Sequence, residues 1–183
     1  MCSILLSYRM TDDWIWQIAA NRDEQLDRAS LPPRVLVQSP KIVGGQDLQA
    51  GGTWFAINRQ ARMFAGLTNR HAGTVPDWQG AHSRGHLIPY ILAASCAREA
   101  KTRLESLLST QTVNHFMMLF GDCHDLFYAD YDNSHNARSH MINTFRKAKP
   151  LILITRPNES DFFQNYNTVH YAPDPVCLSS YLQ

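Results

Sequence analysis

The segments Met1-Cys2-Ser3 and Asn21-Arg22-Asp23-Glu24 flank a predicted hairpin, and the fold prediction starts from them. An apolar run, Ser3 to Tyr8 (SILLSY), and a β-forming run, Trp14 to Ala20 (WIWQIAA), are joined by a short polar segment, which is typical of an antiparallel pair. In such a pair the start of the first strand lies beside the end of the second. We therefore expect residue 2 to lie next to the Asn21–Glu24 run.

Cys2 is a candidate nucleophile because of its position. Methionine aminopeptidases remove Met1 when the following side chain is small, and cysteine meets that condition. Removal would leave the Cys2 thiol beside a free α-amine, whose pKa of about 8 lets part of it accept a proton near pH 7. Nucleophile and base would then belong to one residue, as in N-terminal Thr and Cys nucleophiles. The alternative is that Cys2 is an ordinary residue of the first strand.

Polar side chains at two predicted strand ends also have two interpretations. The Asn21–Glu24 run is either a charged turn or a set of functional side chains beside the first strand. In the second case Asp23 would hold the α-ammonium group, and Arg22 would favour the thiolate or bind an acidic substrate group. Asn69, at the end of a later strand, is either a polar cap or a donor to a developing oxyanion.

The composition is that of a globular protein, with 44% hydrophobic and 18% charged residues among 183. We expect a single domain over residues 1–183. The net charge of +1 gives no electrostatic footprint for nucleic acid or an anionic membrane. No apolar run approaches the roughly 20 residues that span a bilayer, and residues such as Arg9 and Asp12 interrupt any signal-peptide core. These features predict a soluble cytoplasmic protein.

Cysteine and histidine spacing argues against a metal centre. The four cysteines are widely spaced and form no CxxC pair, so a zinc site with paired ligands is not expected. His82 and His86 lack the HExxH pattern. A catalytic pair of Cys123 and His124 is disfavoured, because neighbouring side chains on a strand or turn usually point apart. We expect neither a metal nor another cofactor.

Glycine, proline and strand patterns follow the first hairpin. Leu31-Pro32-Pro33 predicts an extended linker, because the residue before a proline avoids the helical region. The pairs Gly44-Gly45 and Gly51-Gly52 predict tight turns with some backbone facing a substrate. Thr53 to Asn58 and Met63 to Asn69 alternate or are β-rich, and they predict a second hairpin.

Helical patterns occupy the middle of the chain. Ser83 is a suitable N-cap for a helix that begins near Arg84. Apolar residues then recur at helical spacing from Leu87 to about Leu108. The segment Ser95 to Lys101 interrupts this stripe, so two helices describe the region better than one. Within it, Cys96 is expected to be a small buried side chain.

Strand patterns return in the last third. Phe116 to Phe120 (FMMLF) and Leu126 to Tyr131 (LFYADY) predict a third hairpin. Leu151 to Thr155 (LILIT) predicts a further strand. No structure is assigned to the tail, residues 157–183.

Several of these residues form motifs in a fixed order. They are Met1-Cys2, Asn21-Arg22-Asp23-Glu24, Gly44-Gly45-x-Asp47-Leu48-x-x-Gly51-Gly52-Thr53-Trp54-x-x-x-Asn58, Ala65-x-Leu67-Thr68-Asn69 and Ser83-Arg84-Gly85. In this the chain resembles the NRDE family, named after the Asn-Arg-Asp-Glu run, whose eukaryotic members are called transport and Golgi organisation protein 2. The resemblance implies an α+β, Ntn-hydrolase-like fold: a four-layer αββα sandwich with two antiparallel sheets between helix layers.

The resemblance also implies roles for individual residues. The fold is distantly similar to that of choloylglycine hydrolases and penicillin V acylases, which cleave non-peptide amides with an N-terminal cysteine. By motif, Cys2 falls on the nucleophile, Asp23 on the aspartate that contacts its amine, and Asn69 on the oxyanion-stabilising asparagine. The residues expected to contact the substrate are Asn21, Arg22, Thr53 and, as a later active-site asparagine, Asn143.

Three features depart from the acylase pattern. Ala20 stands where the acylases carry an arginine, and Arg22 would point differently. Ala61 replaces a glycine expected in the turn between the third and fourth strands. No counterpart of the C-terminal segment that supplies a late arginine is recognisable after about residue 150. Either the tail substitutes for that segment or the fold is incomplete at the C-terminus.

The resemblance predicts a cysteine amidohydrolase that acts on a non-peptide linear amide. The alternative is a non-catalytic binding or trafficking protein on the same fold, because the family is linked to haem and lipid handling without an agreed chemistry. The partner would be a small-molecule amide in the first case and a haem-like or lipid ligand in the second. Removal of Met1 distinguishes the two hypotheses.

Overall fold

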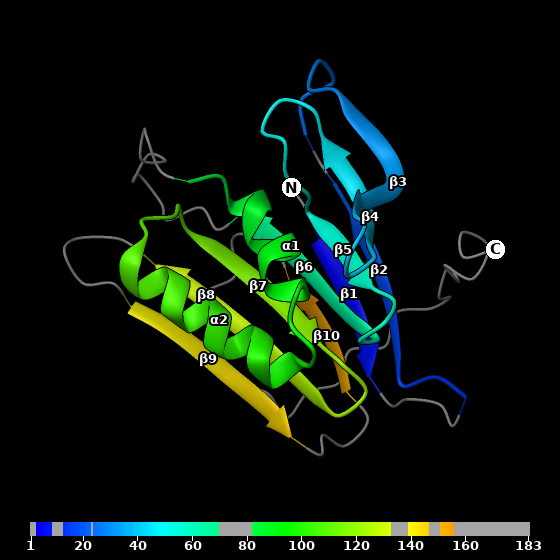
Figure 1. Ribbon diagram of the computed structural model, residues 1–183, viewed down its shortest axis with the longest axis vertical. Coiled ribbons are helices and arrows are strands. Elements are labelled where there is room, and N and C mark those ends of the chain that lie inside the picture. Colours follow the sequence, from blue (N-terminus) through cyan, green and yellow to red (C-terminus); the bar gives the residue numbers. More distant parts are fainter. Residues whose placement is uncertain are drawn as a thin grey trace.

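Two antiparallel sheets and a group of helices make up the computed structural model (Figure 1). The structure describes residues 3–8, 13–22, 24–69, 82–132, 139–146 and 151–155. One sheet has the strand order β10-β1-β2, and the other has the order β3-β4-β5-β6-β7-β8-β9. Every pairing between neighbouring strands is antiparallel. The predicted α+β class with two antiparallel sheets is confirmed.

Ten strands and three helical segments follow one another along the described parts of the chain. The strands are β1 (Ser3–Tyr8), β2 (Trp16–Asn21), β3 (Ser30–Val37), β4 (Ile42–Asp47), β5 (Phe55–Asn58), β6 (Met63–Asn69), β7 (Phe116–Gly121), β8 (Asp125–Asp132), β9 (Ser139–Arg146) and β10 (Leu151–Thr155). The helices are η1 (Arg84–His86), α1 (Leu87–Leu92) and α2 (Ala97–Thr110). All three predicted hairpins and the strand at residues 151–155 are confirmed.

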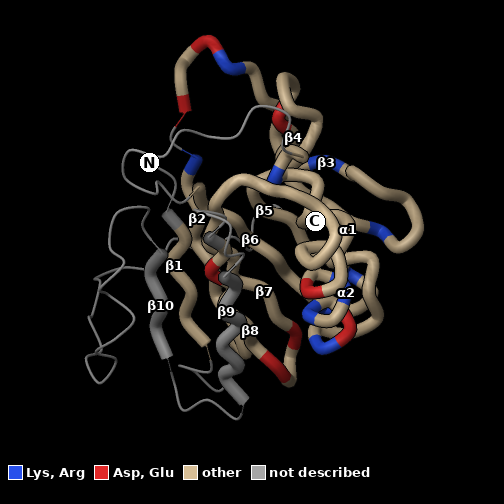
Figure 2. Tube along the Cα trace, turned by 90° about the vertical axis from the view of Figure 1, so that its left-hand side faces the viewer, with Lys and Arg blue, Asp and Glu red and all other residues tan. Residues whose placement is uncertain are grey.

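The large sheet is the middle layer. Figure 2 shows β1 and β2 on one side of it and the helices on the other. Side chains on a strand alternate between faces. Accordingly, Ala65 of β6 packs in the core under the helices, whereas Phe64 packs with Ile4 and Leu6 of β1 in the core between the sheets. Burying a large apolar side chain contributes about 1.5–3 kcal/mol, so both cores hold the sheet in place. The described helices form one layer; a second, outer helix layer is not among the described residues.

The small sheet fixes the position of Ser3, the first described residue. Ser3 is paired with Asn21 in the β1–β2 register, as predicted for the two ends of this hairpin. The small sheet also lies close to β6. A Cβ on Gly66 would come within 2.7 Å of Ile4 Cδ1, so the glycine is needed for the two sheets to approach here.

The predicted linker at Leu31-Pro32-Pro33 is wrong, because these residues belong to β3. A proline lacks the N–H that a central strand must donate, but β3 is an edge strand of the large sheet. Its pairing with β4 is irregular between Leu31 and Arg34, which is where the prolines lie. The extended backbone was predicted correctly, whereas the partner strand was missed.

The predicted turn at Gly44-Gly45 is also wrong, because both glycines lie inside β4. Close packing explains them. A Cβ on Gly44 would lie 2.7 Å from Ala56 Cβ, and a Cβ on Gly45 would lie 2.5 Å from the Trp54 ring. The second pair does form a turn, in which Gly51 has a φ of +73°.

The helical region is broken as predicted, but two details differ. Ser83 precedes η1 without a side-chain cap hydrogen bond. Cys96, expected to be buried, is exposed. Its position explains this, because Cys96 precedes α2, and the N–H of Ala97 is capped from outside the helix by Asp122 Oδ2 at 2.8 Å.

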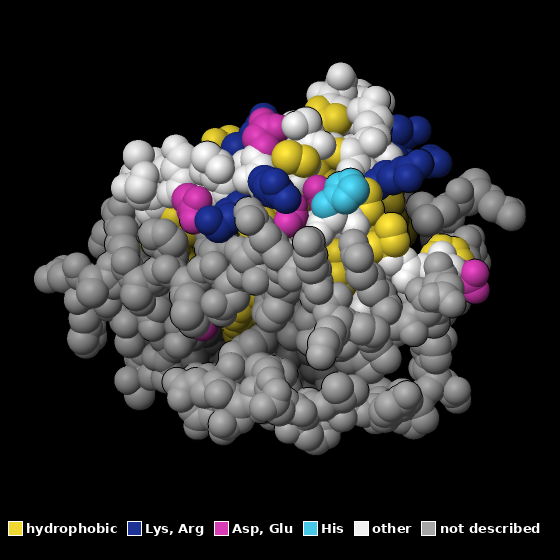
Figure 3. Space-filling model, turned by 90° about the horizontal axis from the view of Figure 1, so that it is seen from below, with side chains coloured by type: hydrophobic (Ala, Val, Ile, Leu, Met, Phe, Trp, Pro, Cys, Tyr) yellow, Lys and Arg dark blue, Asp and Glu magenta, His cyan; other side chains and the backbone are white. Residues whose placement is uncertain are grey.

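The described surface has a mixed character. On the face in Figure 3, acidic and basic side chains lie next to one another with hydrophobic side chains between them. This agrees with the near balance of charge in the sequence. In the part of the chain that the structure describes, no helix is long and apolar enough to cross a membrane.

The turn between β5 and β6 generates a stability prediction. Arg62 has a φ of +50°, a backbone conformation that suits glycine better than a residue with a Cβ. Replacing Arg62 by glycine should therefore raise the free energy of unfolding by about 1 kcal/mol, measured by urea denaturation. Ala61→Gly is the matched control. Ala61 is partly buried against the core, so this substitution should lower the free energy of unfolding. Equal effects of the two substitutions would contradict this explanation.

Candidate functional site

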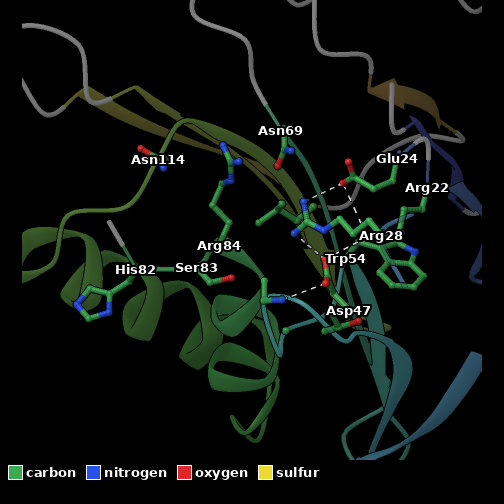
Figure 4. A pocket seen from close by; sticks show the side chains of 15 residues that line it. Arg22, Glu24, Arg28, Asp47, Trp54, Asn69, His82, Ser83, Arg84 and Asn114 are labelled. Atoms are coloured by element: carbon green, nitrogen blue, oxygen red, sulfur yellow. Dashed lines mark hydrogen bonds and ion pairs between the residues drawn. The ribbon is translucent and has the colours of Figure 1, made fainter. Parts of the chain in front are cut away.

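A small cavity opens where β2, β4 and β6 end (Figure 4). Its volume is about 150 Å³, and its lining is mainly polar. The lining residues are Arg22, Glu24, Arg28, Asp47, Ala50, Gly52, Thr53, Trp54, Leu67, Asn69, His82, Ser83, Arg84, Gly85 and Asn114. Figure 4 shows Arg22, Glu24 and Arg28 on one side of the cavity, Arg84 and Asn114 on the other, and Asn69 at its upper edge. The cavity therefore joins the small sheet, the large sheet and the helical layer.

Asp47, the last residue of β4, organises one side of the cavity. Its Oδ2 lies 2.8 Å from Arg28 Nη2 and 3.1 Å from Arg22 Nη2. Its Oδ1 accepts the backbone N–H groups of Gln49 at 2.9 Å and Ala50 at 3.1 Å. Burial by itself raises the pKa of Asp47, but the backbone hydrogen bonds and the guanidinium of Arg28 outweigh it, so the pKa lies below its ordinary value. The carboxylate is therefore ionised at neutral pH.

Arg22 is held from two directions. Besides Asp47, its guanidinium carbon lies 5.0 Å from the centroid of the Trp54 ring, which is a cation–π contact. Trp54 in turn packs against the backbone of Gly45, which leaves no room for a side chain. The motif residues Gly45, Asp47 and Trp54 thus hold in place Arg22, the residue that follows β2.

Arg28 is the second cation on this side. Its Nη1 lies 3.1 Å from Glu24 Oε2, which completes a chain of charges from Glu24 through Arg28 and Asp47 to Arg22. Its Nε is buried and has no hydrogen-bond partner among the described residues. An acceptor bound within reach of this donor would be favourable.

The other side of the cavity is built by the segment before α1. Arg84 donates from Nη1 to the backbone carbonyl of His115 at 2.9 Å. Thr53 N–H donates to the carbonyl of Gly85 at 3.1 Å. A Cβ on Gly52 would lie 2.6 Å from the Gly85 carbonyl carbon, so these two glycines bring the turn and η1 into direct contact. One packing contact therefore explains Gly52 and Gly85 in these two motifs.

Three of the predicted site residues meet at this cavity: Arg22, Thr53 and Asn69. Asn69 is half-buried at the end of β6, and it is paired with Phe116 of β7. The Thr53 hydroxyl donates to the carbonyl of Phe55 at 2.9 Å, so its hydrogen bond is local, to the first residue of β5. Asn21 is exposed and pairs with Ser3.

The remaining predicted site residues are Cys2, Asp23 and Asn143. Cys2 and Asp23 lie outside the described residues. Asn143 is placed on β9, where its backbone is paired with Tyr128, three strands away from β6 in the sheet order. Nothing described brings Asn143 to the cavity lining.

Four charged residues of the cavity were not predicted as site residues: Glu24, Arg28, Asp47 and Arg84. Asp47 and Arg84 stand inside motifs that carry the family resemblance, so the motifs did contain a signal. The identity of their partners was not available from sequence, because Asp47 meets Arg22 across 25 residues. Within the described ranges, no cluster of three or more His, Cys, Asp or Glu side chains is suitable for a metal ion.

The fold and site define a class: an α+β protein with two facing antiparallel sheets and a charged cavity at the ends of β2, β4 and β6. A family model described as Transport and Golgi organisation 2 matches residues 1–158, and the chain belongs to that family. No curated protein matches the chain.

The charge chain around Asp47 predicts a pH-dependent stability. Asp47→Asn keeps an oxygen for the two backbone N–H groups but removes the charge that pairs with Arg22 and Arg28. At pH 7 the free energy of unfolding should fall by about 1–3 kcal/mol, because two partly buried guanidinium groups lose their shared partner.

The pKa of Asp47 gives the direction of the pH effect. Because the pKa is lower in the folded state, the stabilisation is complete above the ordinary value of 3.8 and is lost as the pH falls through the folded-state pKa. Urea unfolding from pH 7 down to pH 2 should show the wild type and Asp47→Asn converging in acid. Glu105→Gln, which removes the exposed pair with Lys101, is the control and should change stability by less than about 0.5 kcal/mol. A constant difference between wild type and Asp47→Asn across this range would contradict the argument.

Proposed function

We propose that the protein is an N-terminal-cysteine amidohydrolase that acts on a non-peptide linear amide. The observation that carries this proposal is the pairing of Ser3 with Asn21. It places the start of β1 beside the residue that leads directly into Arg22, and Arg22 lines the same cavity as Asn69. A nucleophile at position 2 would thus begin next to a preformed polar cavity.

In the proposed reaction the Cys2 thiol transfers its proton to the α-amine and attacks the amide carbonyl carbon. The carbonyl oxygen becomes an oxyanion, to which Asn69 donates a hydrogen bond. The α-ammonium then protonates the leaving nitrogen, the C–N bond breaks, and a thioester remains. Water hydrolyses the thioester to a carboxylic acid and restores the thiol. Asp23 holds and orients the α-amine.

The charges of the cavity favour a substrate with an acidic group. The described lining contains three guanidinium groups, on Arg22, Arg28 and Arg84, and two carboxylates, on Glu24 and Asp47. Arginine binds carboxylate and phosphate oxygens through paired N–H groups. The buried Nε of Arg28 is one donor that such a group would satisfy. N-acyl amino acids combine a linear amide with a carboxylate and are suitable first substrates.

The cavity supports the amidohydrolase better than the haem- or lipid-binding alternative. Pockets for whole small molecules usually enclose about 300–1,000 Å³ and are mostly apolar. The described cavity encloses about 150 Å³ and is rich in charge. It suits the polar end of a substrate near a reacting bond. A haem macrocycle or an acyl chain would need an extended apolar surface, whereas the described lining of this cavity is mainly polar.

The N-terminus provides a direct test of the proposal. Intact mass of the protein expressed without an N-terminal tag should be lower than the full-chain mass by one methionine. The same preparation should release glycine from N-acylglycines, and Cys2→Ala should abolish the release. Cys123→Ala removes a half-buried thiol in the β7–β8 turn and should leave activity unchanged. Retention of Met1 would remove the intrinsic base and refute the hydrolase; haem and lipid binding would then be measured.

Substitution of Asn69 tests its role as an oxyanion donor. Loss of one oxyanion donor commonly lowers kcat by about 10²–10³-fold, so Asn69→Ala should have an effect of that size with a much smaller change in KM. Asn114→Ala alters the same cavity from the opposite side and should have a clearly weaker effect on kcat. Thermal unfolding of both variants checks that they are folded. Similar losses for the two would argue against an oxyanion role for Asn69.

A further inference from the structure

Two carboxylates of the cavity share the guanidinium group of Arg28. Asp47 Oδ2 lies 2.8 Å from Nη2, and Glu24 Oε2 accepts a hydrogen bond from Nη1 at 3.1 Å. Figure 4 shows the Glu24 carboxylate pointing toward this guanidinium group, with the Asp47 carboxylate on its other side. The two carboxylates differ in how firmly the rest of the protein holds them.

Asp47 is a fixed part of the cavity wall. Its side chain is 12% exposed. One oxygen accepts the backbone N–H groups of Gln49 and Ala50, and the other contacts both Arg28 and Arg22. Removing this carboxylate from its place would leave all of these donors to find new partners.

Glu24 is held more weakly. Its side chain is 26% exposed, and Arg22 Nη2 is 3.8 Å from Oε2, beyond hydrogen-bond distance. Its Oε1 accepts the backbone N–H of the next residue, Gln25, at 3.2 Å. The two oxygens thus go to different donors, and the pair with Arg28 lacks the two-point contact that makes carboxylate–arginine recognition strong. Partly exposed ion pairs contribute little to stability, so Glu24 can leave Arg28 at small cost.

The cations stay in place when Glu24 leaves. Arg28 keeps its contact with Asp47, and Arg22 keeps both Asp47 and the Trp54 ring. Binding groups that are already ordered lower the cost of taking up a ligand. The group now on Arg28 Nη1 is a carboxylate, so a ligand carboxylate has the same charge and shape. A one-for-one exchange also leaves the total charge of the cavity unchanged.

We propose that Glu24 is an exchangeable internal carboxylate, and that the single carboxylate of a ligand takes its place on Arg28. The inference deepens the proposed function, on which it rests, because it narrows the acidic substrates to monocarboxylates and assigns their recognition to Arg28. Glu24 competes with the ligand. The apparent affinity is therefore lowered according to the fraction of molecules in which Arg28 is occupied by Glu24.

The test is isothermal titration calorimetry with hexanoate, a monocarboxylate that has no amide bond to hydrolyse. Hexanamide has the same length without the charge, and should bind much more weakly. Glu24→Gln should tighten hexanoate binding roughly fivefold, because the internal competitor is removed. Arg28→Lys should weaken it about tenfold, because lysine keeps the charge but lacks the paired N–H groups.

A second substitution of Glu24 separates exchange from a general effect of charge. Glu24→Asp keeps the charge but shortens the side chain by one methylene, which withdraws the carboxylate from Arg28. Exchange predicts most of the gain in affinity that Glu24→Gln gives, whereas a long-range charge effect predicts none. Glu105→Gln removes the same charge from the exposed pair with Lys101 on α2, and should leave hexanoate binding unchanged. Thermal unfolding checks that each variant is folded.

Three results would overturn the proposal: unchanged affinity in Glu24→Gln, a gain in Glu24→Gln that is absent in Glu24→Asp, or an equal gain in Glu105→Gln. Inorganic phosphate is the competing anion. Phosphate that binds more tightly than hexanoate and responds to the same variants would overturn the assignment to a carboxylate.

Hydrolysis is measured separately, so the failure of this inference is distinguishable from the failure of the proposed function. Tighter hexanoate binding in both Glu24 variants, without hydrolysis of any N-acylglycine, supports the exchange and counts against the amidohydrolase. Hydrolysis by the wild type, with hexanoate affinity unchanged in both Glu24 variants, overturns the exchange alone.

Discussion

The ion pairs of Asp47 connect the two sheets at the end where the cavity lies. Arg22 follows β2 of the small sheet, and Asp47 ends β4 of the large sheet, so their 3.1 Å contact spans the layers. A largely buried ion pair is costly to form and costly to break on one side. Asp47 offsets this cost with further donors: Arg28 and two backbone N–H groups. The polar side of the cavity therefore depends on one carboxylate.

Close approaches at glycines set the shape around that carboxylate. Gly45 admits the Trp54 ring that lies under Arg22, and Gly52 meets Gly85 where the turn contacts η1. Gly66 allows β1 to pack closely against β6. At each of these glycines, the absence of a side chain leaves room for a neighbouring group. The layers can pack this tightly only because no side chain occupies these contacts.

Much of the fold was predictable because its signals are local. The hairpin formed by β1 and β2 and the one formed by β5 and β6 follow from apolar runs separated by polar turns. The errors fall where local and tertiary preferences differ. Pro32 and Pro33 exclude a central strand but are compatible with an edge strand, and edge position is a property of the whole sheet. Gly44 and Gly45 have turn chemistry, but packing against β5 and Trp54 outweighs it.

For the candidate site, the sequence by itself determined that the start of the first strand lies beside the Asn21–Glu24 run and that Asn69 ends a strand. Strand pairing through a short connection is enough to establish both. Only the tertiary structure decided that Arg22, Asn69 and Arg84 line one cavity and that Asp47 pairs with two arginines. These contacts join segments that are distant along the chain and belong to different layers. Their geometry depends on how sheets and helices pack, which no local pattern encodes.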